Sequence, residues 1–225
     1  GRASLKTLKE TTLQSFFFVA NAQGLKANVH YKFNAQSNQI LFPNKSIIFL
    51  KDLFLYPSDP NFDELGSLEI TDAFIDETAQ ITKKAFDIVG SRIRYQLDEN
   101  GLIPKILWTS NPSKNWNYSE FYKPHKNDEL LHYRKFVQSL VTDNPFISQH
   151  YIDNLNKLPL IDRERLLYGN WEYDDDPARL MEYDKIINIF SNNFVKSGSR
   201  YITADIARFG SDKAVIMVWE GYRVI

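Results

Sequence analysis

The chain has 225 residues, of which 43% are hydrophobic and 24% charged, an ordinary composition for a folded soluble protein with one large domain or two small ones. Its 27 basic and 28 acidic side chains nearly cancel, so the net charge gives no argument for binding to nucleic acid. The lack of cysteine excludes disulfides and thiolate metal sites and fits a reducing compartment, and no apolar run approaches the ~20 residues of a membrane span.

Residues 1–67 predict a helix followed by short strands. Apolar residues recur at helical spacing over 7–25, where Gly24 marks a stop. Residues 27–43 alternate in polarity and break at Asn and Ser, which is typical of short strands joined by a turn. We expect 46–53, SIIFLKDL, to be a buried strand, followed by a loop with one short helix.

The centre of the chain alternates strands and helices. Residues 68–77 contain a short apolar strand that ends at Asp76, residues 78–97 have one apolar face and predict a helix, and residues 104–108 predict another strand. A strand, a helix and a strand joined by short connections indicate an α/β fold with a parallel sheet. Ligand-binding groups in such sheets lie beyond the carboxyl ends of the strands.

Asp76 and Glu77 form an acid pair at the carboxyl end of the first of these strands. In nucleoside triphosphatases one such carboxylate holds Mg²⁺ on the phosphates, and the next orients and deprotonates the attacking water. The same pair also suits the start of a helix, where acids favour the positive end of the dipole. Its spacing alone does not decide between these two interpretations.

A second polar group, Thr109, Ser110 and Asn111, follows the strand at 104–108. Small polar side chains there can hydrogen-bond a γ-phosphate or its attacking water, but Ser-Asn-Pro also suits a simple turn before Pro112. The turn is the better interpretation of this motif alone. The acid pair on a neighbouring strand favours a functional role.

Arginines and histidines give weaker signals. Arg92 and Arg94, at the end of the predicted helix, could face a phosphate, but they are more simply explained as solvated or as favouring the negative end of the helix dipole. The four histidines show no metal-ligand spacing.

We expect four elements in the next part of the chain: a strand at 129–140, helices at 143–158 and 162–171, and a solvated acidic linker at 172–177. Two apolar strands, 201–207 and 214–219, then flank a polar turn and predict a β-hairpin that opens a second domain.

Asp205 lies in the first strand of this hairpin, where a carboxylate is costly unless it is paired or binds a cation. Two-metal nucleases use such a central acid to hold both ions, so we favour a metal site at Asp205. Asp212, across the turn, is better explained as a turn former.

Five parts of the chain, in this order, resemble the large subunit of the tailed-phage terminase. They are SIIFLKDL with GSLEITDAFIDETAQI, ITKKAFDIVGSRIR, PKILWTSNPSKNWNYSEFY, DNPFISQHYIDNLNKL with RERLLYGNWEY, and TADIARFGSDKAVIMVW. The first part is similar to the Walker B segment with the strand before it, and the second to the helix that follows. The third is similar to the coupling-motif strand and its loop, and the fourth to the helical stretch before the interdomain linker. The fifth is similar to the first hairpin of the nuclease domain. Each part alone is weak, and their shared order makes the resemblance specific.

The resemblance implies a role for each candidate residue. Asp76 would be the Walker B acid that coordinates Mg²⁺, and Glu77 the catalytic carboxylate of ATP hydrolysis. Residues 109–111 would form the coupling motif that links hydrolysis to movement. Asp205 would be the first metal-binding acid of the nuclease, which uses Mg²⁺ or Mn²⁺.

The resemblance also implies the domains and the partners. A P-loop NTPase-like parallel sheet would form an ATPase domain at 1–140, a helical linker region would span 141–198, and an RNase H-like nuclease domain would start at 199–225. The family uses ATP to translocate double-stranded viral DNA into procapsids, and it cleaves the concatemer. Its partners are the portal protein and the small terminase subunit, in a homo-oligomeric ring, without a membrane, in the cytoplasm of the infected bacterial host.

The sequence departs from the family because it lacks the phosphate-binding pattern G-x-x-x-x-G-K-[ST] and the later nuclease acids. We therefore expect an internal piece of a longer protein, inactive on its own. Two alternatives stay open. One is a degenerate ATPase-like module that docks on a partner or on DNA without hydrolysis. The other is a fragment of a superfamily 2-type helicase, which the hairpin with Asp205 fits poorly.

Overall fold

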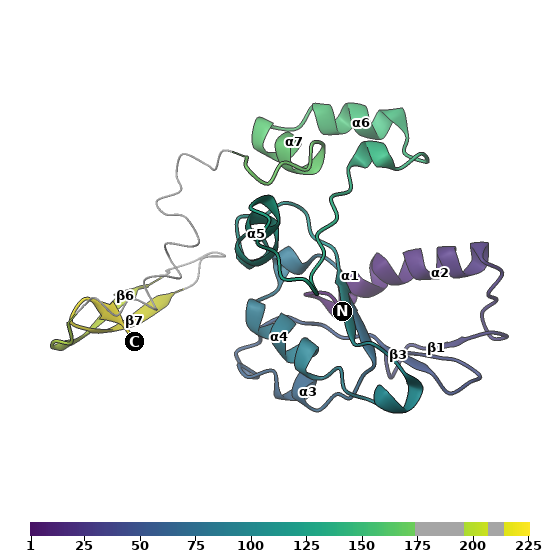
Figure 1. The fold of residues 1–225 in the computed structure, drawn as a ribbon, viewed down its shortest axis with the longest axis horizontal. Helices are drawn as coiled ribbons and strands as arrows, with labels where there is room; N and C mark the ends of the chain where they lie inside the picture. Colours follow the sequence, from purple (N-terminus) through teal and green to yellow (C-terminus); the bar gives the residue numbers. More distant parts are fainter. Residues whose placement is uncertain (174–195, 207–213) are drawn as a thin grey trace.

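The computed structural model describes residues 1–173, 196–206 and 214–225 (Figure 1). In these ranges the chain has a mixed α/β fold with three small sheets, made of β1-β2-β3, β4-β5 and β6-β7-β8. No helix in the described ranges is long and apolar enough to cross a membrane.

The first elements are α1 (Leu5–Glu10), α2 (Thr12–Ala22), β1 (Lys32–Asn34), β2 (Gln39–Leu41) and β3 (Ile47–Phe49). The two helices are pieces of the predicted helix at 7–25, interrupted at Thr11, and the chain leaves α2 through Gly24, whose φ of 82° suits glycine. Buried side chains of α2 pack with Tyr31, which directly precedes β1, and with Ile40 of β2. The predicted helix and the two short strands are therefore confirmed.

The predicted strand at 46–53 is shorter than expected and is not buried. β3 pairs antiparallel with β2, and the side chains of Ile47 and Ile48 are 44% and 40% exposed. In the described part of the chain β3 lies at the edge of a three-stranded sheet. An apolar run marks a strand buried on both faces only where other elements cover it. The predicted burial was therefore wrong, although the strand itself is present.

The central elements are α3 (Asp63–Gly66), β4 (Asp72–Ile75), α4 (Lys83–Ser91) and β5 (Lys105–Trp108). β4 and β5 pair in parallel, with Ile75 opposite Trp108, which confirms the predicted strand, helix and strand. α4 begins after Thr82, whose hydroxyl accepts a hydrogen bond from the N–H of Ala85. Because the strands pair in register, the residues that follow them lie side by side.

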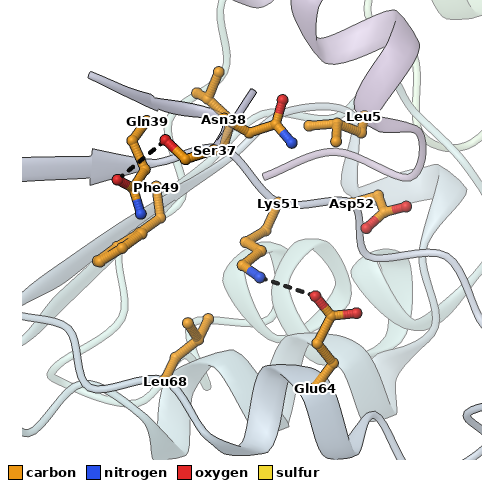
Figure 2. A pocket seen from close by; sticks show the side chains of 10 residues that line it. Leu5, Ser37, Asn38, Gln39, Phe49, Lys51, Asp52, Glu64 and Leu68 are labelled. Carbon is orange, nitrogen blue, oxygen red and sulfur yellow. Dashed lines mark hydrogen bonds and ion pairs between the residues drawn. The ribbon is translucent and has the colours of Figure 1, made fainter. Parts of the chain in front are cut away.

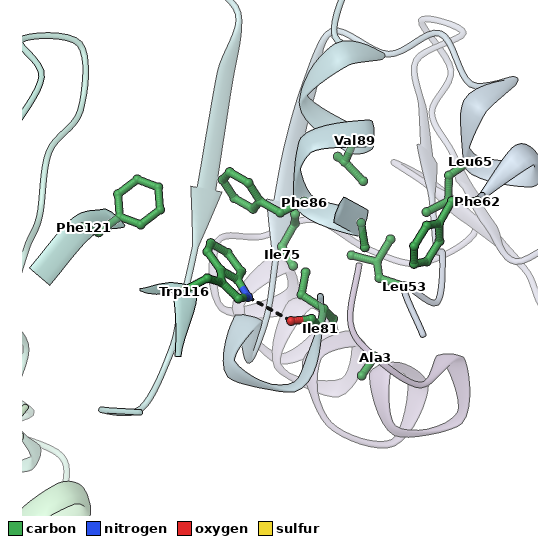
Figure 3. Packing of buried hydrophobic residues seen from close by; sticks show 11 residues of the cluster. Ala3, Leu53, Phe62, Leu65, Ile75, Ile81, Phe86, Val89, Trp116 and Phe121 are labelled. Atoms are coloured by element: carbon green, nitrogen blue, oxygen red, sulfur yellow. Dashed lines mark hydrogen bonds between the residues drawn. The ribbon is translucent and has the colours of Figure 1, made fainter. Parts of the chain in front are cut away.

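An aromatic cluster holds the loop after β5 against α4 (Figure 3). The ring centroid of Phe86 lies 5.2 Å from that of Trp108 and 5.0 Å from that of Trp116. The indole N–H of Trp116 also donates to the carbonyl of Ile81 at 2.9 Å. The buried aromatic residues thus fix where the chain runs after it leaves the sheet.

The next elements are a π-helical turn (Tyr118–Tyr122), α5 (Lys123–Lys126), α6 (Gln149–Asn156) and α7 (Leu160–Leu166). α6 and α7 confirm the predicted helices, with shorter bounds. The strand predicted at 129–140 is absent, and the segment has neither helix nor strand. Its Phe136 instead packs on the rings of Tyr122, His125 and Trp171, so its apolar residues serve side-chain packing rather than strand pairing.

The last elements are β6 (Arg200–Asp205), β7 (Val215–Glu220) and β8 (Arg223–Val224), which pair antiparallel. The predicted hairpin is therefore confirmed. Residues 174–195, which contain most of the predicted linker, and 207–213, which contain Asp212 and the hairpin turn, lie outside the described residues.

Candidate active site

Asp76 and Glu77 follow β4 directly, and Thr109 follows β5. The hydroxyl of Thr109 donates to Oδ1 of Asp76 at 2.7 Å and accepts from the N–H of Glu77 at 3.2 Å. The backbone N–H of Thr109 donates to the carbonyl of Ile75 at 3.0 Å, and its carbonyl accepts from the N–H of Thr78 at 2.9 Å. One residue after β5 thus contacts every residue from Ile75 to Thr78.

Neither acid starts the following helix. Glu77 has a left-handed backbone, with φ 55° and ψ 55°, which costs a residue other than glycine roughly 1 kcal/mol or more. It leads into a short 3₁₀ turn (Thr78–Gln80) without a side-chain cap, and the cap of α4 is Thr82. The interpretation of the pair as a helix start is therefore wrong, because the hydrogen bonds of Thr109 turn the chain there instead.

Asp76 is held in its ionised form. Nη1 of Arg2 lies 3.0 Å from Oδ2 of Asp76, and the hydroxyl of Thr12 donates to the same oxygen. Burial disfavours the charge of Asp76, but the hydrogen bonds from Thr12 and Thr109 and the charge of Arg2 outweigh it and hold the pKa below its ordinary value. Asp76 is therefore a permanent anion at neutral pH.

Glu77 is shifted in the opposite direction. Burial and then the negative charge of Asp76 raise the pKa of Glu77, while Arg2, the backbone of Asn111 and Arg165 oppose the shift. The side-chain amide of Asn111 also donates to Oε1 of Glu77 at 3.4 Å. Two adjacent carboxylates with opposed pKa shifts suit one charged ligand and one proton acceptor.

Ser110, which was predicted for the site, and the two arginines considered for it have structural partners. The hydroxyl of Ser110 donates to the carbonyl of Asn111 at 2.9 Å and so shapes the turn. Arg92 donates to the carbonyl of Gly66 at 2.7 Å, and Arg94 pairs with Glu69 at 3.3 Å. Both arginines therefore hold the segment before β4, a structural role that the sequence did not indicate.

Asp205 is not buried, contrary to the argument that its charge would be costly. Every residue of β6 is exposed, so water can solvate the carboxylate. Within the described ranges, no group of three or more His, Cys, Asp or Glu is arranged to hold a metal ion. Its metal role therefore has no support from burial.

The first residues of the chain contribute to the site, although no predicted element included them. The carbonyl of Gly1 accepts from the N–H of Asp76 at 2.9 Å, so the chain start runs beside β4 and brings Arg2 to the acid. The only sequence signal for this segment is Lys6–Thr7, the last pair of the phosphate-loop pattern, preceded by Leu5 instead of glycine.

A cavity of about 200 Å³ lies elsewhere, lined by residues of β2, β3, α3 and the neighbouring loops (Figure 2). Within it the ammonium of Lys51 pairs with Glu64 at 3.1 Å. Asp76 and Glu77 do not line this cavity. The candidate site is therefore defined by the side chains at the ends of β4 and β5 and not by this cavity.

Comparison with known proteins gives one family. The family model described as phage terminase large subunit, Terminase_3, matches residues 2–169. A search of curated proteins finds no match. Among solved structures, the chain is similar to the large terminase of a thermophilic bacteriophage, with a TM-score of 0.57 and 14% identity in one crystal form. The complexes of that protein with ADP and with ATP-γ-S give TM-scores of 0.58 and 0.54, at 15% and 14% identity.

Each of these alignments covers 97% of this chain and 50% of the other. The chain thus spans about half the length of the structures that it matches. At this level of identity the similarity shows the fold, while the family model covers most of the sequence.

Neutralising Asp76 should reduce stability, whereas neutralising Glu77 should not. The lowered pKa of Asp76 means that its contribution is complete above the ordinary value of 3.8 and is lost as the pH falls through the lowered value. Asp76→Asn should therefore reduce the free energy of unfolding at neutral pH by about 1–3 kcal/mol. Arg2 and Thr12 lose their charged partner in this variant.

Glu77→Gln should leave the free energy of unfolding unchanged or raise it. The charge of Glu77 costs stability in full above the raised pKa, and that cost disappears as the pH falls from the raised value to the ordinary value of 4.5. Urea unfolding at neutral pH measures both variants, with the exposed Glu99→Gln as a control that should match the wild type. An equal loss of stability in the two variants would contradict the opposed pKa shifts.

Proposed function

Because the chain belongs to the phage terminase large subunit family, we propose that the ends of β4 and β5 form the ATP-hydrolysing site of a DNA-packaging motor. In this proposal the whole protein translocates double-stranded viral DNA into procapsids and cleaves the concatemer. The observation that carries the proposal is the hydroxyl of Thr109, which joins the carboxylate of Asp76 to the backbone of Glu77.

Asp76 is the proposed metal ligand. Mg²⁺ takes one or two carboxylates from a protein and fills its other positions with water and phosphate oxygens. An ionised Asp76 would supply one such carboxylate once its Oδ2 is released from Arg2, which pairs with it here. The metal, when bound, supplies neutralisation of the phosphate charge. The chain supplies an aspartate whose orientation is fixed by Thr12 and Thr109.

Glu77 is the proposed base. Its raised pKa favours accepting a proton from the attacking water, and the amide of Asn111 orients one of its oxygens. Thr109 and Asn111 would thus sense the state of the site, and Ser110 would shape the loop between them. Such a loop can link hydrolysis to movement because it belongs to a different strand from the acids.

We infer the same domain bounds as the sequence indicates: a P-loop NTPase-like domain at 1–140, a helical linker region at 141–198 and an RNase H-like hairpin from 199. The parallel pairing of β4 with β5 and the antiparallel pairing of β6 with β7 support this division. Asp205 would hold Mg²⁺ or Mn²⁺ with acids from elsewhere in the whole protein. The ADP and ATP-γ-S of the similar structures support a nucleotide as the other ligand.

The proposed partners follow from the same function. They are double-stranded DNA, the portal protein, the small terminase subunit and further copies of the chain in a ring. The place of action would be the cytoplasm of an infected bacterium.

One observation favours the alternative of a degenerate module that docks without hydrolysing ATP. Leu5 precedes Lys6 and Thr7, where the phosphate-loop pattern has a glycine that lets the backbone approach the phosphates. Titration of Mg²⁺-ATP into the full-length protein separates the two functions. Absence of binding would support the docking module.

Glu77→Gln should reduce ATP turnover by the full-length protein by at least ~100-fold, the usual contribution of a general base. Binding of Mg²⁺-ATP should persist, because the amide has the same shape and Asp76 is intact. Single-turnover hydrolysis and calorimetric titration measure the two effects, with Glu99→Gln as the control. Wild-type turnover in the Glu77 variant would remove this residue from its proposed role.

Asp205→Ala should abolish DNA cleavage by the full-length protein and leave ATP turnover unchanged, because the residue lies in a different sheet from the acid pair. Cleavage of linear double-stranded DNA in the presence of Mn²⁺ measures this. Glu220→Ala removes an acid from the other strand of the same hairpin and serves as the control. Normal cleavage by the Asp205 variant would exclude the nuclease assignment.

A further inference from the structure

Arg165, on α7, is bound to the loop that carries Asn111. Its Nε donates to the carbonyl of Pro112 at 2.9 Å, and Pro112 is buried and directly follows Asn111. The amide of Asn111 in turn reaches Oε1 of Glu77 at 3.4 Å, which is the upper limit of a hydrogen bond. A contact this long depends on where the backbone at Pro112 is held.

Tyr173 also binds the loop after β5 that Arg165 contacts. Its hydroxyl accepts from the backbone N–H of Lys114 at 3.4 Å. The guanidinium of Arg165 lies 5.6 Å from the centre of the Tyr173 ring, and the ammonium of Lys114 lies 5.8 Å from it. The ring of Tyr173 therefore contacts one cation from α7 and one from the loop, which fixes the two relative to each other.

Glu172 adds a charged contact beside Tyr173. Its carboxylate accepts from Lys126 at 3.0 Å and from the hydroxyl of Tyr118 at 3.2 Å, and it lies 3.7 Å from the ammonium of Lys114. Burial opposes the charge of Glu172, but the hydrogen bonds of Lys126 and Tyr118 outweigh it and lower the pKa. The start of the predicted linker is thus bound to the protein rather than merely solvated, contrary to the sequence prediction.

We propose that Arg165, Glu172 and Tyr173 form a clasp that positions Asn111 against Glu77. Arg165 is the main positioning residue, since it acts through Pro112, the neighbour of Asn111. The two residues at 172–173 keep the rest of the loop from moving away. The catalytic consequence of the clasp rests on the proposed function, because Glu77 without its amide donor is less well oriented toward water.

The experiment compares Arg165→Ala, Arg165→Lys and Glu172→Gln in the full-length protein. Arg163→Ala is the matched control, because it removes the same side chain from α7 but its guanidinium donates to the carbonyl of Asn156. Two readouts are used: the kcat and KM of ATP hydrolysis, and hydrogen exchange of the backbone amides at 109–117.

Arg165→Ala should lower kcat roughly 10- to 100-fold with little change in KM, the effect of a displaced catalytic group. Exchange at 109–117 should become faster in the same variant. Arg165→Lys should recover part of kcat, because an ammonium can donate to the carbonyl but lacks the planar guanidinium. Glu172→Gln should have a smaller effect in the same direction, and Arg163→Ala should match the wild type in both readouts.

Two results would overturn the clasp. One is a wild-type kcat with wild-type exchange in Arg165→Ala. The other is an equal loss of kcat in Arg165→Ala and Arg163→Ala, which would show a general weakening of α7. If the wild-type protein itself does not hydrolyse ATP, the proposed function fails, and exchange alone decides. Faster exchange only in Arg165→Ala would then support the clasp, and unchanged exchange would overturn it.

Discussion

The hydroxyl of Thr109 is the interaction on which the rest of the site depends. One oxygen atom binds the carboxylate of Asp76 and the backbone of Glu77 at the same time. It thereby joins the ends of two parallel strands. It also stabilises the left-handed backbone of Glu77, which turns the chain before the next helix begins. The proposed division of the two acids into a charged ligand and a proton acceptor rests on this geometry, because the turn places Asp76 near Arg2 and Glu77 near Asn111.

A second consequence is that the site is shared between distant parts of the sequence. Arg2 and Thr12 approach Asp76 from the start of the chain, and Arg165 approaches the loop after β5 from α7. Thr109 lies between these two sets of contacts, because it binds Asp76 and begins the loop that Arg165 contacts. This arrangement suits the proposed motor, in which hydrolysis at the end of one strand must change the position of another segment.

The sequence predicted the local elements of the site well, because they have strong patterns. The apolar runs at β4 and β5 are short and bounded by polar residues, so their parallel pairing and the position of Asp76 could be inferred. The contacts of Arg2, Arg165 and Glu172 could not, since they join residues far apart in the chain and leave no periodic signal. The same limit explains two errors: the strand at 46–53 is present but lies at an exposed edge, and the strand predicted at 129–140 is absent because its apolar residues serve side-chain packing.

The central claim is that the hydroxyl of Thr109 assembles the two acids into one active site. The most direct measurement is the kcat of ATP hydrolysis by the full-length protein with Thr109→Val and Thr109→Ser. Valine keeps the shape but removes both hydrogen bonds, and serine keeps the hydroxyl. The account predicts that Thr109→Val loses at least ~100-fold in kcat, comparable with the loss of a preorganised donor, and that Thr109→Ser stays close to the wild type. Equal and near-normal turnover in both variants would contradict it.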